Sequence, residues 1–150
     1  MISLTGGYII LKNLNQYNTR ALLILSTISL MIDLDHFTGL GIQVLHNLTV
    51  PALTIVAFIY LHKKKQEKYA AYMLALTVML GGCLLMDMVQ GMYGIPLFYP
   101  LSSELYLMPA SWDITLPWDH TSNIISRHGI ALLLYYGAVF LASKLFSCRR

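Results

Sequence analysis

Long apolar runs alternate with short polar stretches along this chain, and the runs have the length of helices. Four runs stand out, at residues 20–40, 45–61, 69–90 and 128–146. Each approaches the roughly 20 residues with which a helix crosses about 30 Å of hydrocarbon. Lipid cannot satisfy free backbone groups, so a membrane-crossing segment of this kind is expected to be helical. The pattern predicts about four transmembrane helices.

Two segments depart from this pattern. Residues 1–19 mix apolar positions with glycines, asparagines and a lysine, which predicts a short interfacial or partly inserted helix. Residues 91–127 contain four prolines, which exclude one continuous helix, and six aromatic residues. Aromatic side chains favour the headgroup level, so this segment is expected to be a long loop on the membrane surface. The alternative is a lid over a site, because long ordered loops are often functional.

The composition agrees with a membrane protein of one domain, residues 1–150. The chain is 57% hydrophobic and 11% charged, with a mean hydropathy of +0.62, whereas soluble domains carry roughly 25% charged residues. A soluble core of this size could not cover so much apolar surface, so the lipid bilayer is the expected partner. The net charge of +3 is too small to indicate nucleic-acid binding. We therefore expect an all-α, multi-pass integral protein of the cell membrane.

Clusters of basic residues predict the orientation, because short loops rich in lysine and arginine stay in the cytoplasm. One cluster lies at residues 63–68, and another is formed by Arg149 and Arg150. Both clusters can be cytoplasmic only if an even number of spans separates them, and two predicted spans do. The expected topology therefore has both termini inside and the long aromatic-rich segment 91–127 outside.

The same topology gathers acidic and histidine residues at the outer membrane face. Asp33, Asp35 and His36 fall at the outer end of the first span. His46 opens the second span, and Asp87 lies near the outer end of the third. An ionised aspartate costs about 2.5–3.5 kcal/mol at the centre of a spanning helix, and less near its ends. A proton, a cationic partner or a metal ion would offset this cost, and carboxylates with imidazoles suit Zn, Mn or Fe.

Three short motifs occur in order along the chain. Residues 32–36 read Ile-Asp-Leu-Asp-His, and Leu45-His46-Asn47 follows. Asp87 then precedes the sequence Tyr-Gly-Ile-Pro-Leu-Phe-Tyr-Pro at residues 93–100. Together these motifs resemble the Asp-x-Asp-His motif, the helix-opening histidine, and the later aspartate with Tyr-Gly-x-Pro-Leu-x-x-Pro of the YdjM-like family of membrane-bound metal-dependent hydrolases. The resemblance covers roughly residues 20–102.

The resemblance implies a divalent metal site and a function. The implied metal ligands are Asp33, Asp35, His36, His46 and Asp87, with Asp35 and Asp87 as the candidate catalytic residues. The protein would then be a membrane-embedded, metal-binding protein of the hydrolase type. If it is an enzyme, it would cleave an ester or a phosphoester near the outer leaflet, with a carboxylate as the general base.

The sequence departs from the family at three positions where a histidine is common. Gly6 follows Thr5, Cys83 stands four residues before the downstream aspartate, and residues 49–51 supply no histidine. These departures weaken the case for catalysis more than the case for binding one ion. The alternative function is a non-enzymatic accessory subunit that binds partner subunits in a larger membrane complex.

Individual candidates also have simpler structural explanations. His46 could form a hydrogen bond at a helix start, and Asp87 could form one between helices. Cys83 could be a small packing residue. Arg127, next to the fourth span, could lie at the interface or could clamp a phosphate or carboxylate.

Overall fold

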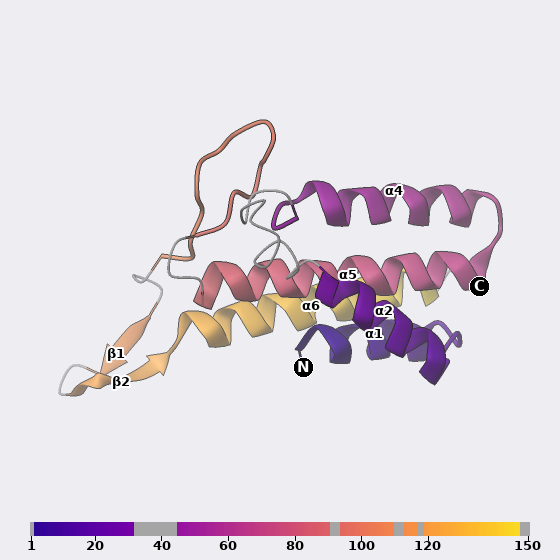
Figure 1. The fold of residues 1–150 in the computed structure, drawn as a ribbon. Coiled ribbons are helices and arrows are strands. Elements are labelled where there is room, and N and C mark those ends of the chain that lie inside the picture. The colour runs from indigo at the N-terminus through magenta and orange to yellow at the C-terminus, as the bar shows by residue number, and fades with distance from the viewer. Residues whose placement is uncertain (1, 32–44, 91–93, 110–112, 117–118, 148–150) are drawn as a thin grey trace.

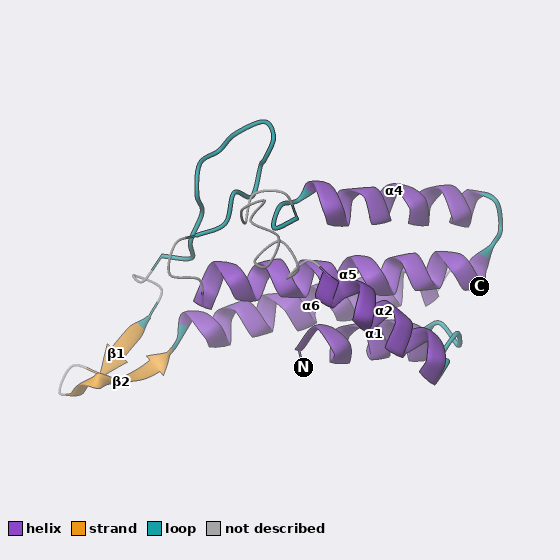
Figure 2. Cartoon of the chain, viewed as in Figure 1, coloured by secondary structure: helices purple, strands orange, loops and turns teal. Residues whose placement is uncertain are grey.

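A computed structural model describes residues 2–31, 45–90, 94–109, 113–116 and 119–147. The described residues form five helices and one two-stranded antiparallel hairpin (Figures 1 and 2). The helices are α1 (Ile2–Asn13), α2 (Thr19–Leu30), α4 (Thr49–Lys63), α5 (Glu67–Gln90) and α6 (Arg127–Ser147). The strands are β1 (Ile114–Leu116) and β2 (Asp119–Ile125). A predominantly helical fold is thus confirmed.

Helix α5 is the central element, and α1, α2, α4 and α6 all pack against it. Its small and apolar side chains face these neighbours, so that Ala71, Ala75 and Met79 are almost completely buried. Ile10 and Leu11 of α1 belong to the same core cluster and are also fully buried. The N-terminal segment is therefore an integral part of the helix bundle.

Two helix hairpins, α1–α2 and α4–α5, are closed by the same kind of turn. Helix α1 ends because Asn15 adopts a left-handed conformation with φ 55°, and α4 ends because Lys65 adopts the same conformation with φ 59°. In each turn the next residue donates its N–H to a carbonyl five positions back, at 2.9 Å in both cases. This is the hydrogen bond of a Schellman-type helix end. Asn18 then caps α2, since its side chain accepts from the backbone of Arg20 at 2.9 Å.

Most basic residues gather at one end of the bundle, which we call the basic end. It comprises the α1–α2 turn, the α4–α5 turn and the C-terminal end of α6 (Figure 1). Two contacts bring these three parts together: Asn13 donates to Ser143 at 3.1 Å, and the rings of His62 and Phe146 lie 6.0 Å apart. The charged turn at residues 63–68 thus lies at the same end as the last turn of α6. His46, Asp87 and the hairpin lie at the opposite end.

The predicted spans agree with the observed helices to different degrees. The third and fourth predictions, 69–90 and 128–146, match α5 and α6 to within two residues. These two helices are long and apolar enough to cross a membrane by length and composition. The second prediction, 45–61, corresponds to the shorter α4, which begins and ends later. The first, 20–40, is helical over Thr19–Leu30, and its part from residue 32 lies outside the described residues.

The long connection between α5 and α6 has more structure than the expected loop. Ile95 and Tyr106 form an antiparallel bridge with backbone hydrogen bonds of 3.0 and 2.8 Å. Farther along, β1 and β2 pair in an irregular register before α6 begins. The prolines of residues 91–127 correctly excluded one continuous helix. The sequence pattern did not predict these pairings, which join residues within the same connection.

Candidate functional site

His46 and Asp87 come together at the end of the bundle opposite the basic end. His46 lies in the turn that precedes α4, and Asp87 lies in the last turns of α5. Their Nε2 and Oδ2 atoms are 3.5 Å apart. The His46 side chain is 2% exposed, whereas the Asp87 side chain is 37% exposed. The Oδ2 atom of Asp87 is itself buried, so the carboxylate joins a buried imidazole on one side to an accessible space on the other.

The turn that carries His46 is held by hydrogen bonds from both sides. Asn47, which is 2% exposed, accepts the N–H of Thr49 on its side-chain oxygen at 2.9 Å. This hydrogen bond forms an Asx turn that leads into α4 and satisfies its first backbone N–H. Leu48 donates its N–H to the carbonyl of Leu97 at 2.9 Å. The turn is therefore fixed by its own sequence and by the connection that follows α5.

Residues 94–108 connect this turn to the end of α5. The hydroxyl of Thr49 donates to the carbonyl of Tyr99 at 3.0 Å, and Met108 donates its N–H to the carbonyl of Met88 at 2.9 Å. Gly94 has φ +75°, and a Cβ there would lie 3.1 Å from the carbonyl oxygen of Tyr106, so only glycine suits this position. The backbone of this connection thus orients both candidate site residues.

The connection at residues 94–108 also carries an exposed acidic side chain, Glu104. The hydroxyl of Tyr106 donates to the Glu104 carboxylate at 3.0 Å. This hydrogen bond raises the pKa of Tyr106 above its usual value. Both groups are solvent-accessible, so Glu104 is a surface carboxylate, and among the described residues it does not form a metal-binding group with His46 and Asp87.

The structure brings together two of the five expected metal ligands. Asp33, Asp35 and His36 lie outside the described residues. Within the ranges that the structure describes, no three histidine, cysteine, aspartate or glutamate side chains are close enough to hold one ion. Cys83 lies one turn before Asp87 on α5 and, within the same ranges, does not complete such a group. A complete site on this chain would therefore need ligands from beyond the described side chains, and the predicted ligands Asp33, Asp35 and His36 are of that kind.

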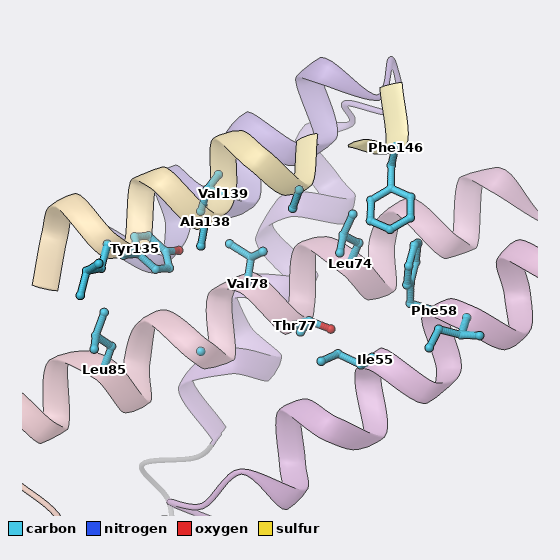
Figure 3. Close-up of a pocket in the computed structure, with 14 residues that line it drawn as sticks. Ile55, Phe58, Leu74, Thr77, Val78, Leu85, Tyr135, Ala138, Val139 and Phe146 are labelled. Carbon is cyan, nitrogen blue, oxygen red and sulfur yellow. The ribbon is translucent and has the colours of Figure 1, made fainter. Parts of the chain in front are cut away.

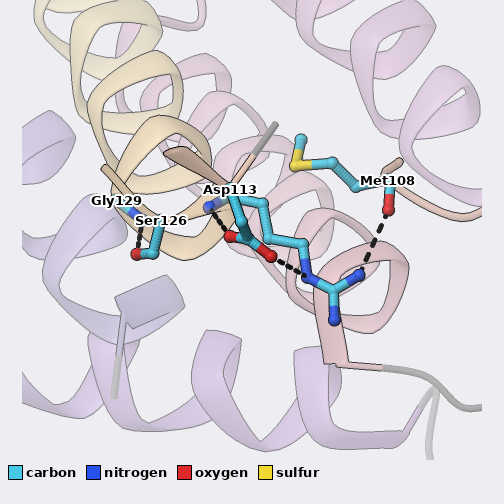
Figure 4. Close-up of polar contacts among 5 residues, drawn as sticks. Met108, Asp113, Ser126 and Gly129 are labelled. Atoms are coloured by element: carbon cyan, nitrogen blue, oxygen red, sulfur yellow. Dashed lines mark hydrogen bonds and ion pairs between the residues drawn. The ribbon is translucent and has the colours of Figure 1, made fainter. Parts of the chain in front are cut away.

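Arg127 belongs to a different local network, shown in Figure 4. Its backbone N–H donates to Oδ1 of Asp113 at 2.7 Å, and its Nε lies 3.7 Å from Oδ2 of the same carboxylate. A guanidinium N–H also donates to the carbonyl of Met108 at 3.4 Å. The sequence had not assigned a partner to Arg127. The guanidinium, which the sequence left as a possible ligand for a phosphate, instead contacts Asp113. This network holds the connection that follows α5 against the start of α6.

An apolar groove runs along another face of α5, between α4 and α6 (Figure 3). Its volume is about 620 Å³, and its wall includes Leu74, Gly81 and Leu85 of α5. Asp87 follows Leu85 by two residues, which turns it about 200° around the helix axis. The groove and the His46–Asp87 pair therefore lie on opposite sides of α5, so the groove does not lead to the pair.

Comparisons with protein-family models, with curated proteins and with solved structures find no match to this chain.

Proposed function

We propose that this protein is a membrane-embedded metal-binding protein with a site at His46 and Asp87, and that it belongs to the hydrolase type which its motifs resemble. The distribution of apolar side chains supports the membrane part. Helix α6 buries little more than Ala131, Tyr135 and Val139, while large apolar side chains on its other faces are exposed. A helix that is apolar on all sides and mostly unburied is suited to lipid and poorly suited to water.

The lengths of the helices support the same proposal. At about 1.5 Å per residue, α5 extends about 36 Å and α6 about 32 Å, close to the hydrocarbon thickness of about 30 Å. Helices α1 and α2 extend only about 18 Å each. In the proposed arrangement, the turn of the α1–α2 hairpin lies at the basic end, and the two helices extend from there through part of the thickness of the bilayer.

The separation of His46 Nε2 and Asp87 Oδ2 is the observation that carries the metal proposal. At 3.5 Å the contact is longer than the usual range of about 2.7–3.2 Å for a nitrogen–oxygen hydrogen bond. Two ligands about 2.1 Å from one zinc ion, at a tetrahedral angle, are about 3.4 Å apart. An imidazole and a carboxylate at this spacing therefore suit a shared divalent ion, with Asp33, Asp35 and His36 as the further proposed ligands.

The two described residues would have different roles. Buried His46 is fixed by the turn before α4 and would bind the ion without moving. Asp87 is partly accessible, so its second oxygen can accept a proton from a water molecule that attacks an ester or phosphoester. The divalent ion would supply Lewis-acid stabilisation of the negative charge that develops on the substrate. Asp35 is the other candidate base.

Metal content and its coupling to stability test this proposal. The full chain purified in detergent should contain about one divalent ion by elemental analysis. Chelation should lower its melting temperature, because an ion at a hundred times its Kd stabilises the folded state by about 2.7 kcal/mol. His46→Gln and Asp87→Asn should each lose the ion and become insensitive to chelator. Glu104→Gln, an accessible carboxylate at the same end, is the matched control and should behave as wild type.

A gain of stability in Asp87→Asn, where the metal site predicts a loss, would contradict the metal site. Without an ion, Asp87 is a carboxylate at a costly depth, and Asp87→Asn should then leave stability unchanged or raise it. A wild-type protein that is insensitive to chelator, together with a stabilised Asp87→Asn variant, excludes both the metal site and the hydrolase proposal. Asp113→Asn is unsuitable as a control, because it breaks the contact with Arg127.

Labelling of single cysteines tests the membrane topology independently of the metal. Lys65→Cys and Ser103→Cys, each in a chain without other cysteines, place one accessible thiol at each end of the bundle. In intact cells, an impermeant maleimide should label position 103 and leave position 65 unlabelled. Labelling of position 65 with protection of position 103 would contradict the proposed orientation.

A further inference from the structure

The two ends of the bundle differ strongly in charge. Eight basic residues lie in the described ranges, and seven of them are at the basic end: Lys12, Arg20, Lys63, Lys64, Lys65, Lys68 and Lys144. In those ranges, Glu67 is the one acidic residue at that end, and it lies 3.4 Å from His62. The excess positive charge therefore remains largely uncompensated by protein carboxylates.

A pocket of about 230 Å³ opens at this end between the last turns of α1 and α6. It is lined by Asn13, Phe140, Ser143, Lys144 and Ser147. The amide of Asn13 donates to Ser143 at 3.1 Å, and Ser143 in turn donates to the carbonyl of Phe140 at 2.8 Å. An asparagine amide has two N–H donors, so one remains for a ligand. The pocket combines a cation, further donors and an aromatic wall.

Lys144 reaches from the helix end back towards the apolar part of α6. Its Nζ lies 5.6 Å from the ring centroid of Phe140, one turn earlier in the helix. Side chains of a helix lean towards its N-terminus, which explains this direction. Among the described residues, no carboxylate forms an ion pair with Lys144. A cation at the boundary of an apolar layer gains most from an anion that lies at that same depth.

We propose that this pocket binds one anionic phospholipid, with its phosphate at Lys144 and Asn13 and an acyl chain along Phe140. Charge complementarity selects the lipid class, because anionic headgroups are drawn to basic residues beside a membrane. The aromatic wall selects a lipid over a free anion, since it continues from the polar pocket onto the apolar surface of α6. This inference rests on the proposed membrane insertion and is independent of the metal site.

Native mass spectrometry of the full chain in detergent tests the pocket, with phosphatidylglycerol and phosphatidylcholine as probes. Wild type should bind one phosphatidylglycerol more tightly than phosphatidylcholine. Lys144→Gln should weaken phosphatidylglycerol binding about fivefold, as expected for one lysine beside an anionic lipid. Lys144→Arg should retain binding. Lys68→Gln removes an exposed lysine from the same end but not from the pocket, and it should bind as wild type does.

Three results would overturn the proposal. One is equal binding of both lipids by wild type, and another is an equal loss of binding in Lys144→Gln and Lys68→Gln. The third is binding of glycerol 3-phosphate as tight as that of the lipid, which would assign the pocket to a free phosphate. Ser147→Asp adds a negative charge to the exposed rim and should also weaken binding. A chain that fails to insert into lipid nanodiscs would instead refute the membrane proposal itself.

Discussion

Two adjacent glycines of α5, Gly81 and Gly82, face opposite extremes of packing. A Cβ on Gly82 would lie 2.8 Å from the ring of Tyr135, whereas a Cβ on Gly81 would have no atom within 4 Å. Gly82 belongs to the side of α5 that packs against α6 and α1. Gly81 lies in the wall of the apolar groove between α4 and α6. One step along the helix thus separates the closest-packed region of the molecule from an open one.

The packed side depends on glycine, and the open side does not. Tyr135 of α6 fits between two helices because Gly6 of α1 and Gly82 of α5 have no side chains. A Cβ on Gly7 would similarly lie 2.6 Å from the sulfur of Met79. Small residues allow helices to approach closely, which is how helices associate in lipid. Helix α4, by contrast, leaves a gap to α6, so the groove has room for larger side chains.

The largest expected effect comes from filling both sides with the same residue. Gly82→Leu should destabilise the protein by about 3 kcal/mol or more, because the new side chain must displace Tyr135. Gly81→Leu should stay within about 1 kcal/mol of wild type, since it enters open space and improves helix propensity. Thermal unfolding in detergent measures both. Gly137→Leu, at another open position, is the matched control, and equal losses at positions 81 and 82 would contradict the asymmetry.

A double-mutant cycle examines the packed side at the point where a Cβ on Gly6 would overlap the hydroxyl oxygen of Tyr135. Gly6→Ala should therefore cost about 1–3 kcal/mol. Tyr135→Phe removes that oxygen, which is buried and has no hydrogen-bond partner among the described residues, so it should be neutral or stabilising.

In the Tyr135→Phe background, Gly6→Ala should cost at least about 1 kcal/mol less than in wild type, because the two groups interact directly. The free energy of unfolding of the four proteins gives this coupling. Additive effects of the two substitutions would show that α1 does not pack on Tyr135 in this way.

The smallest expected change in stability concerns a hydrogen bond between α4 and α5 beside the apolar groove. The hydroxyls of Thr54 in α4 and Thr77 in α5 lie 2.7 Å apart and form the polar contact between these helices near the groove. Thr77→Val keeps the shape and removes this hydrogen bond, which should cost about 0.5–1.5 kcal/mol. Thr27→Val, where the hydroxyl bonds only within its own helix and is exposed, serves as the control. An equal loss of stability in Thr77→Val and Thr27→Val would show that the contact between Thr54 and Thr77 does not stabilise the packing of α4 on α5.

The sequence predicted the long helices well and the short ones poorly. Apolar length alone defined α5 and α6 to within two residues, because no proline or charged cluster interrupts them. Helix α1 was expected only as a short interfacial or partly inserted helix, and its place in the core was not foreseen. Gly6 and Gly7 read as interruptions in the sequence, although in the structure they are the positions that allow close packing.

The candidate site was predictable only in part. The topology placed His46 and Asp87 at the same end, and the structure adds their 3.5 Å separation. The buried Asn47 was missed as a structural residue, although an Asn two residues before the start of a helix is a recognisable Asx-turn signal. Asp113 was treated as an ordinary loop residue, because nothing in the sequence pairs it with Arg127 fourteen residues later.

The sequence by itself determined which segments are apolar and helical, and it placed the basic clusters together and the candidate ligands at the other end. These properties follow from local composition and from the alternation of direction between successive helices. Only the tertiary structure decided that Gly82 is closed and Gly81 open, that Asp87 faces His46 and not the groove, and that Lys144 lines a pocket with Asn13. The physical reason is that each of these depends on the rotation of one helix against another. That rotation results from side-chain packing between distant segments, and the pattern of residues along the chain does not reveal it.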